Sequence, residues 1–388
     1  MRLTICILVV ATFCAHVAFG EDSNITFQKT QLDSAFRAEG VAVADFNKDG
    51  KMDIAAGPVW FAAPDWKMHT IHSDGKEYQP KGYSDCFNAW ADDFNNDGWM
   101  DVLQITWPGK EAVWYENPQG KDGPWKKHVA TPVASNESPQ YQDVDGDGKR
   151  ELIIGFAEKN PDADDRRMGI ARPAGDPYAL WNVQPISETA APNTKRYAHG
   201  LGVGDINGDG RKDIVVPQGW WEQPADVAST DWKFHSAPLG QACADMHVLD
   251  LDGDGDADVL SSSAHNYGIW WHEQVEAGKW ETHEIDKSFS QTHAMCVADI
   301  NGDGLTDFVT GKRWWAHGGR DPGGNDPAVF HWFELTREDG QPKWTRHQFD
   351  HDSGPGTQFQ LADVNGDKLW DVVTANKKGV HIFVQIKK

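Results

Sequence analysis

One nine-residue pattern recurs seven times along this chain and limits its fold more than any other feature. The pattern is D-x-[DN]-x-D-G-x-x-[DE] followed directly by an apolar residue, and its clearest copy runs from Asp205 to Asp213. Successive copies begin 48, 50, 62, 45, 49 and 64 residues apart. A repeat of this length is typical of proteins built from identical blades or solenoid turns.

The spacing of oxygen-bearing side chains within the pattern predicts a calcium loop. Side chains at positions 1, 3, 5 and 9 can converge on one hard cation, glycine at position 6 permits the sharp turn, and position 7 can offer its backbone carbonyl. Position 7 varies freely, from Lys51 to Trp99 to Leu305, as a backbone ligand would allow. The loops contain no thiol or imidazole, which disfavours zinc and copper. The predicted calcium ligands are Asp45, Asn47, Asp49, Asp53, Asp93, Asn95, Asp97, Asp101, Asp143, Asp145, Asp147, Glu151, Asp205, Asn207, Asp209, Asp213, Asp250, Asp252, Asp254, Asp258, Asp299, Asn301, Asp303, Asp307, Asp363, Asn365, Asp367 and Asp371.

The alternative to calcium is a set of acidic turns that bind nothing. Two carboxylates ~4 Å apart repel each other by about 4 kcal/mol at an effective dielectric constant near 20. The predicted ligands of these loops include 23 acidic residues, in a chain of formal net charge −23. We therefore expect up to seven structural calcium ions. Occupancy of the last loop stays open, because Lys368 replaces its glycine.

β-Rich runs flank the loops, so each repeat should contain a hairpin with the loop at its turn. Such runs precede the loops at residues 41–44, 200–204 and 295–298 and follow them at 54–56, 214–216 and 308–310. An aromatic third run is seen at residues 112–115, 268–271, 330–333 and 380–384. A fourth carries W-x-x-H, at Trp66/His69, Trp125/His128, Trp232/His235, Trp280/His283 and Trp344/His347. Four strands per repeat predict an all-β, seven-bladed propeller of antiparallel blades.

The seventh repeat ends after its third strand, so the ring needs a strand from elsewhere. Phe27 lies 18 residues before Asp45, as Trp125 lies 18 before Asp143. We therefore expect residues 27–30 to complete the last blade, which would close the ring and remove both sheet edges. The W-x-x-H histidines would then belong to the outer strands rather than to a catalytic site.

The loops resemble the FG-GAP/VCBS repeats of bacterial secreted propellers and integrin α-subunit heads, over nearly the whole mature chain. This resemblance implies that each loop joins the innermost strand to the second on the lower face of the disc, and that the calcium is structural. Function does not follow from it, because such folds carry both binding proteins and enzymes.

The first 20 residues indicate export. Arg2, a short apolar run and the sequence Ala18-Phe19-Gly20 form a secretory signal with a cleavage site near Gly20. We expect a secreted or periplasmic single domain over residues 21–388, without membrane insertion. Its acidic charge argues against nucleic acid as a partner.

Three cysteines remain, Cys86, Cys243 and Cys296, so at least one thiol is free or pairs with another chain. Cys243 and Cys296 could meet, but buried free thiols are favoured.

The upper face, opposite the loops, holds the candidate functional residues, because function concentrates at loop ends. His199 and His293 each lie six residues before the first calcium ligand of their repeat. The catalytic candidates are His199, His293, His265, Tyr83, Lys312 and Arg313, and the ligand-binding candidates are Trp314, Trp315, His247, Asn266 and Tyr267. Long insertions at residues 157–184 and 312–327 are expected on the same face, the second as a loop over a pocket.

Two functions fit these residues. One is a binding module for a carbohydrate or protein partner. The other is a sugar lyase, dehydratase or isomerase, in which a histidine or Tyr83 abstracts a proton and Lys312 or Arg313 stabilises the enolate. His199, His265 and His293 could also hold a transition metal. The layout loosely resembles the propeller part of aldos-2-ulose dehydratase and other propeller sugar lyases. Convergence of His199, His265, His293 and Lys312 in a concave pocket would favour the enzyme.

Overall fold

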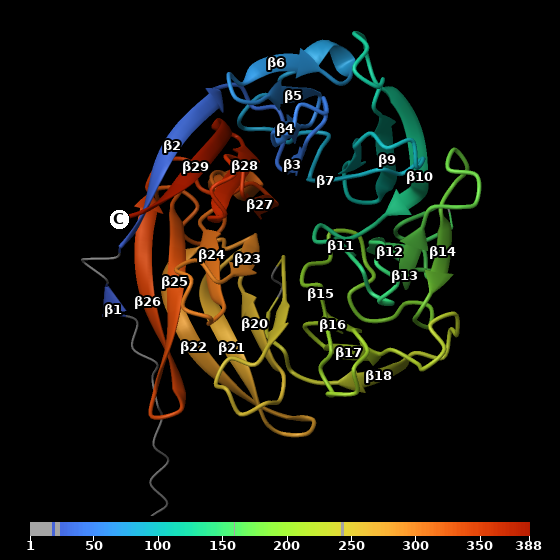
Figure 1. Cartoon of the computed structure of the whole chain (residues 1–388). Coiled ribbons are helices and arrows are strands. Elements are labelled where there is room, and N and C mark those ends of the chain that lie inside the picture. The colour runs from blue at the N-terminus through green and yellow to red at the C-terminus, as the bar shows by residue number, and fades with distance from the viewer. Residues whose placement is uncertain (1–17, 20–23, 159, 242–243) are drawn as a thin grey trace, which may run out of the picture.

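The computed structural model describes residues 18–19, 24–158, 160–241 and 244–388, and its strands form seven sheets arranged in a ring (Figure 1). Blade 1 consists of β3 (Ala42–Ala44), β4 (Asp53–Ala56), β5 (Val59–Ala62) and β6 (Lys67–Thr70). Blade 2 consists of β7 (Asn88–Asp92), β8 (Asp101–Ile105), β9 (Lys110–Glu116) and β10 (Lys126–Ala134). Blade 3 consists of β11 (Gln140–Gln142), β12 (Glu151–Phe156), β13 (Arg167–Arg172) and β14 (Asn182–Pro185). Blade 4 consists of β15 (Gly202–Gly204), β16 (Asp213–Val216), β17 (Gly219–Glu222) and β18 (Lys233–Ser236). Blade 5 consists of β19 (His247–Leu249), β20 (Asp258–Ser262), β21 (Tyr267–Glu276) and β22 (Lys279–Ser290). Blade 6 consists of β23 (Met295–Ala298), β24 (Asp307–Gly311), β25 (Phe330–Glu338) and β26 (Gln341–Asp350). Blade 7 consists of β27 (Phe359–Ala362), β28 (Asp371–Asn376), β29 (Gly379–Lys387) and β2 (Ile25–Asp33).

These sheets confirm the predicted seven-bladed propeller with four antiparallel strands per blade. The first strands of most adjacent blades contact each other around the central axis. Every nonapeptide loop joins the first strand of its blade to the second, and we call the end where these loops lie the lower face. Two short 3-10 turns, η1 (Ser73–Gly75) and η2 (Ala316–Gly319), accompany the strands. Among the described residues, no helix is long and apolar enough to cross a membrane.

The ring closes as the sequence predicts. Strand β2 pairs antiparallel with β29, with Phe27 opposite Gln385, and Figure 1 shows the two side by side. The closing strand is also held by an ion pair to the neighbouring blade, since Lys29 Nζ lies 2.8 Å from the buried Asp350 carboxylate. Most of the predicted signal lies outside the described residues; of it, β1 (Ala18–Phe19) pairs in parallel with β26.

The hydrophobic core lies between neighbouring blades rather than at the axis. In one cluster, Ile54 of blade 1 is buried together with Val102 of blade 2 and Val373 of blade 7. Strands with apolar residues on both faces therefore supply contacts to both neighbours, which explains why the second strands of blades 1, 2 and 7 are buried throughout.

The W-x-x-H histidines serve the outer strands. His235 of β18 stacks on Trp220 of the third strand, with ring centroids 4.2 Å apart, and its Nε2 lies 2.7 Å from Glu222. The same stack and the same carboxylate partner recur in three other blades, at His128, His283 and His347. Each histidine thus joins the third strand to the fourth.

One predicted insertion is only partly on the upper face. Residues 157–184 contain the third strand of blade 3, β13, so the part from 173 to 181 connects β13 with β14 at the lower end. Its prolines Pro173 and Pro177 line a cavity together with Asp147 of the third loop. Placing the whole insertion above the blade was therefore wrong. Cys86 is buried and free, Cys296 is half-buried and free, and Cys243 lies outside the described residues.

Candidate functional site

The sixth residue before each nonapeptide loop forms a ring around the upper end of the central axis. At this position the seven blades place Glu39, Phe87, Glu137, His199, Ala244, His293 and Thr357, all of them buried. Backbone hydrogen bonds link the ring across blades, as when Thr357 N donates to Glu39 O at 2.8 Å. Equivalent backbone positions thus bring seven side chains of five kinds to the upper end of the axis.

Three of these ring side chains meet at a single point. Glu137 Oε2 lies 3.1 Å from His199 Nε2 and 3.2 Å from His293 Nε2, and the two nitrogens are 3.1 Å apart. The three atoms therefore form a nearly equilateral triangle. Ligand atoms 2.0–2.1 Å from a tetrahedral zinc ion would lie roughly 3.3 Å from one another. The triangle has the dimensions of one face of a transition-metal coordination sphere.

Hydrogen bonding alone does not account for this cluster. Besides Glu137 and His293, His199 Nε2 also faces His265 Nε2 at 3.2 Å, so three polar atoms surround one ring nitrogen. A neutral imidazole nitrogen carries either one hydrogen or one lone pair, and so makes one such bond. A cation bound between the ligand atoms would satisfy all of them at once.

His265 flanks the triangle from the upper connection of blade 5, where the ring position holds only the small Ala244. Its Nδ1 lies 3.2 Å from Asp321 Oδ2, and His317 Nδ1 lies 3.0 Å from the other oxygen of the same carboxylate. With the Nδ1 hydrogen donated to Asp321, the Nε2 lone pair of His265 points toward the triangle. Asp321 and His317 belong to the predicted loop at residues 312–327.

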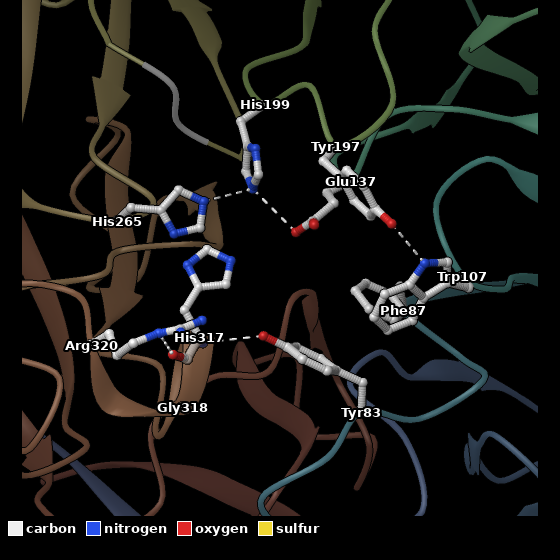
Figure 2. Close-up of a pocket in the computed structure, with 10 residues that line it drawn as sticks. All are labelled: Tyr83, Phe87, Trp107, Glu137, Tyr197, His199, His265, His317, Gly318 and Arg320. Atoms are coloured by element: carbon white, nitrogen blue, oxygen red, sulfur yellow. Dashed lines mark hydrogen bonds and ion pairs between the residues drawn. The ribbon is translucent and has the colours of Figure 1, made fainter. Parts of the chain in front are cut away.

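A cavity of about 740 Å³ opens over the cluster, as Figure 2 shows. Aromatic rings form the wall opposite the histidines, and the Tyr83 hydroxyl points toward His317, whose backbone N–H it accepts at 3.1 Å. Trp107 Nε1 donates to the Tyr197 hydroxyl at 3.0 Å on the same wall. The lining residues are Tyr83, Phe87, Trp107, Glu137, Tyr197, His199, His265, His317, Gly318 and Arg320.

The environment of the cluster favours the protonation states that bind metals. Burial, and then the charge of Arg313, lower the pKa of His293 well below its ordinary value. Burial, followed by the neighbouring His199, lowers the pKa of His265 to about 4. Burial would raise the pKa of Glu137, but hydrogen bonds to His199 and His293 outweigh it and hold the pKa well below its ordinary value. Neutral imidazoles and an ionised carboxylate are the forms that coordinate a cation.

The structure brings together some of the residues that the sequence singled out and separates others. His199, His293 and His265 meet in the cluster, and Tyr83 lines the cavity over it. Arg313 is buried close enough to His293 to lower its pKa, whereas the buried Lys312 Nζ turns to the Arg313 carbonyl at 3.4 Å. Neither basic side chain lines the cavity.

The five ligand-binding candidates lie outside this cavity. Trp314 and Trp315 pack on each other, with ring centroids 5.5 Å apart. Asn266 and Tyr267 follow His265, and the Tyr267 hydroxyl lies 3.4 Å from Asp326. His247 lines a different cavity, along the inner strands, and its Nε2 lies 3.2 Å from the Met295 carbonyl.

Sequence reasoning missed Glu137, although the signal was present. Glu137 occupies the same place before Asp143 that His199 and His293 occupy before their own loops, and Phe87 of the cavity wall does so before Asp93. No comparable signal marks Tyr197, which lies in the long connection between blades 3 and 4.

The seven lower loops share one conformation that gathers oxygen atoms. In the first loop, Asp45 accepts hydrogen bonds from the backbone N–H groups of Asp49 and Gly50, at 3.1 and 2.9 Å. Lys368 of the seventh loop adopts the left-handed conformation, with φ of 69°, and its N–H donates to Asp363 at 2.9 Å as Gly50 does to Asp45. The seventh loop therefore keeps the shape of the others.

The carboxyl group at position 9 ties each loop to the sheet. Asp213 is fully buried and accepts hydrogen bonds from Ile206 N–H at 3.1 Å and Gln223 N–H at 2.9 Å. Burial raises its pKa to about 7, which a bound cation would oppose. In the third loop Arg172 contacts two predicted ligands, Asp145 at 2.9 Å and Glu151 at 3.7 Å. That arginine would compete with a cation there.

Parts of the chain match a known repeat family, and its fold is similar to that of solved structures. The FG-GAP-like repeat family matches residues 93–154 and 250–310, which cover the loops of blades 2, 3, 5 and 6. No curated protein matches the sequence of this chain. Similar solved structures include a lectin of Agrocybe aegerita described as recognising non-reducing terminal N-acetylglucosamine, and the rhamnogalacturonan lyase YesW. Each is 14% identical to this chain with a TM-score of 0.46. The matches cover 93% of this chain and 86% of the lectin chain, and 92% of this chain and 75% of the lyase chain. The chain is thus a seven-bladed β-propeller that contains FG-GAP-like repeats at residues 93–154 and 250–310.

Proposed function

We propose that Glu137, His199 and His293 bind a transition-metal ion and that the cavity above them is the active site of a lyase, dehydratase or isomerase. The observation that carries this proposal is the triangle of ligand atoms, 3.1 to 3.2 Å on each side. Two imidazoles and one carboxylate on one face, with the opposite side open, form the ligand set of catalytic zinc sites and of the facial triad. The donor set fits zinc, iron or manganese better than calcium.

The residues around the metal face supply the remaining groups for a proton abstraction. A metal ion here would polarise a carbonyl or hydroxyl oxygen of the substrate. The His265–Asp321 pair would then act as general base, because Asp321 fixes the Nδ1 hydrogen and leaves the Nε2 lone pair directed toward the triangle, where the substrate would bind. Tyr83, on the opposite wall, would donate a hydrogen bond or a proton to the developing oxyanion.

The walls of the cavity favour a carbohydrate as substrate. Tyr83, Phe87, Trp107 and Tyr197 offer flat apolar ring faces, while the opposite side holds histidines and Arg320. Rings on one side and polar groups on the other match the two kinds of surface that a sugar presents. A volume of about 740 Å³ is enough for a mono- or disaccharide.

Two successive measurements, of metal content and then of activity, test the proposal. The purified protein should retain close to one equivalent of zinc, manganese or iron by elemental analysis, and His293→Ala should retain almost none. A screen of keto-sugars and acidic oligosaccharides should then give turnover with the metal-loaded protein and none with His293→Ala. Metal binding without any turnover would favour the binding-module interpretation. Absence of metal from a fully folded protein would refute the proposal.

We also propose that the seven lower loops bind calcium as structural ions and that the protein is exported. The loops supply carboxylate oxygens, the ligands that calcium prefers. In two loops, three of these ligand groups already lie within 4.8 Å of one another, namely Asp143, Asp145 and Glu151, and Asp250, Asp252 and Asp254. Extracellular calcium concentrations would keep such sites filled.

A further inference from the structure

The third blade differs from its neighbours at the end of its third strand, beside the lower loop. In blades 2, 4, 5 and 6 this strand end carries a glutamate that contacts the W-x-x-H histidine, namely Glu116, Glu222, Glu273 and Glu334. In blade 3 the strand pairing places Arg172 there, one residue after the partner of the first residue that follows the loop. Gln184 takes the place of the histidine, and Arg172 Nη1 donates to its Oε1 at 3.1 Å. Blade 3 thus carries a positive side chain where those blades carry a negative one.

The next residue of blade 3 cannot make a hydrogen bond that the other six blades make. In those blades the backbone N–H at this position donates to the position-9 carboxylate at 2.8 or 2.9 Å, from Ala63, Asn117, Gln223, Gln274, Leu335 and Gln385. Blade 3 has Pro173 here, which carries no N–H. Its position 9 is Glu151, whose Oε2 accepts the usual bond from Val144 N–H and whose Oε1 lies 3.7 Å from Arg172 Nε. Arg172 therefore faces the oxygen that a backbone N–H satisfies elsewhere.

Arg172 also reaches the middle of the loop. Its Nη2 lies 2.9 Å from Asp145 Oδ2, and the Asp145 side chain is only 11% exposed. Asp143, Asp145 and Glu151 each place a carboxylate oxygen within 4.8 Å of the other two. Ionised carboxylates this close repel one another unless a cation lies beside them. In blade 3 the chain itself supplies a positive charge against two of the three.

We infer that Arg172 supplies the cation of the third loop, so that this loop keeps its conformation without calcium and binds calcium more weakly than its neighbours. The inference rests on the structural calcium proposed above for the lower loops. A calcium ion entering the third loop must compete with the guanidinium for Asp145 and approach a like charge. Loss of one hydrogen bond between charged groups weakens binding at least about tenfold, so the Kd of the third loop should exceed that of the sixth by at least about this factor.

A count of calcium sites tests this inference on the purified protein. In calorimetric titrations of chelator-treated samples with calcium, Arg172→Gln should show one more high-affinity site than the unaltered protein. Arg167→Gln removes a positive charge at the other end of β13 and should leave the number unchanged. Arg172→Lys keeps a positive charge beside the loop and should also leave it unchanged.

Melting temperatures give a second readout that does not depend on counting sites. In a calcium chelator, Arg172→Gln should melt roughly 2–4 °C below Arg167→Gln, because the third loop has then lost the cation that the chain supplies. In saturating calcium the two variants should melt together, since the ion takes the place of the guanidinium.

The outcomes separate this inference from the calcium proposal. An equal number of high-affinity sites in Arg172→Gln and the unaltered protein would overturn the inference and leave structural calcium standing. A deficit in melting temperature that saturating calcium does not remove would assign Arg172 to packing alone, and would overturn it as well. If no variant bound calcium, the calcium proposal itself would be refuted, and this inference with it.

Discussion

The lower and upper ends of the same strands differ in how they use repetition. At the lower end, all seven blades carry the same loop, and even Lys368 adopts the conformation of the glycine it replaces. At the upper end, the equivalent position holds Glu39, Phe87, Glu137, His199, Ala244, His293 or Thr357, according to the blade. A feature that every blade needs is repeated, whereas one asymmetric site on the axis requires the blades to carry different residues at equivalent positions.

This difference separates the two kinds of metal site that we propose within one chain. The lower loops offer oxygen ligands from a single continuous segment, so each blade can form its own site. The upper cluster takes nitrogen and oxygen ligands from blades 3, 4 and 6, so it exists only once the ring has closed. Loss of a lower site should therefore affect stability, and loss of the upper site should affect chemistry.

The largest expected effect is on upper-site metal content, and it should distinguish two glutamates that share the ring position. Glu137→Gln should lower the content of upper-site metal from about one equivalent to near zero, because an amide is a poor replacement for a charged ligand. Glu39→Gln should keep the metal. Glu39 also lies six residues before its own loop, but it pairs with Lys377 instead. Elemental analysis after dialysis measures both. Equal metal content in the two variants would contradict the assignment of Glu137.

Removal of calcium should produce the next largest effect. A ligand that binds only the folded state at 100 times its Kd stabilises it by about 2.7 kcal/mol per site. With several sites emptied, we expect the melting temperature to fall by about 10 °C or more in a calcium chelator. Readdition of calcium, but not of magnesium, should restore it. A melting curve unaffected by thorough chelation would refute structural calcium.

A pair of substitutions at position 6 of the loops tests whether the seventh loop equals the others. Lys368→Gly should stabilise the protein by roughly 1 kcal/mol, because a left-handed backbone costs a non-glycine residue roughly 1–2 kcal/mol. Gly210→Lys in the fourth loop, at φ of 85°, should destabilise it by a similar amount. Urea unfolding in calcium gives both values. If neither substitution changed the stability, position 6 of these loops would not be left-handed in solution.

The smallest expected effect concerns the outer strands. Glu222→Gln weakens the contact with His235, and the two side chains are 31% and 30% exposed. Pairs this exposed contribute about 0.2–1 kcal/mol, so the loss should fall in that range, with upper-site metal content unchanged. Blade 1 is a natural control, since Ala62 takes the place of the glutamate beside Trp60 and His69. A loss of metal in Glu222→Gln would contradict a purely structural role for these histidines.

The sequence alone determined the scaffold. Seven copies of one loop, their spacing and the W-x-x-H strands predicted the number of blades, their four strands and the closing strand at residues 27–30, and the structure confirms each. These features depend on contacts within a repeat or between neighbouring repeats. Local patterns are therefore sufficient to predict them. The same patterns identified His199 and His293, because both share an offset from a loop.

Only the tertiary structure decided what those histidines face. Glu137 lies 62 residues before His199 in sequence, and His293 lies 94 after it, yet closure of the ring brings the three side chains to within 3.2 Å of one another. Contacts across a ring axis depend on how every blade in between packs and twists, which no single repeat encodes. For the same reason Trp314 and Trp315, although they belong to the same loop as the cavity residue His317, lie outside the cavity. Repetition specified the ring, and closure of the ring created the site.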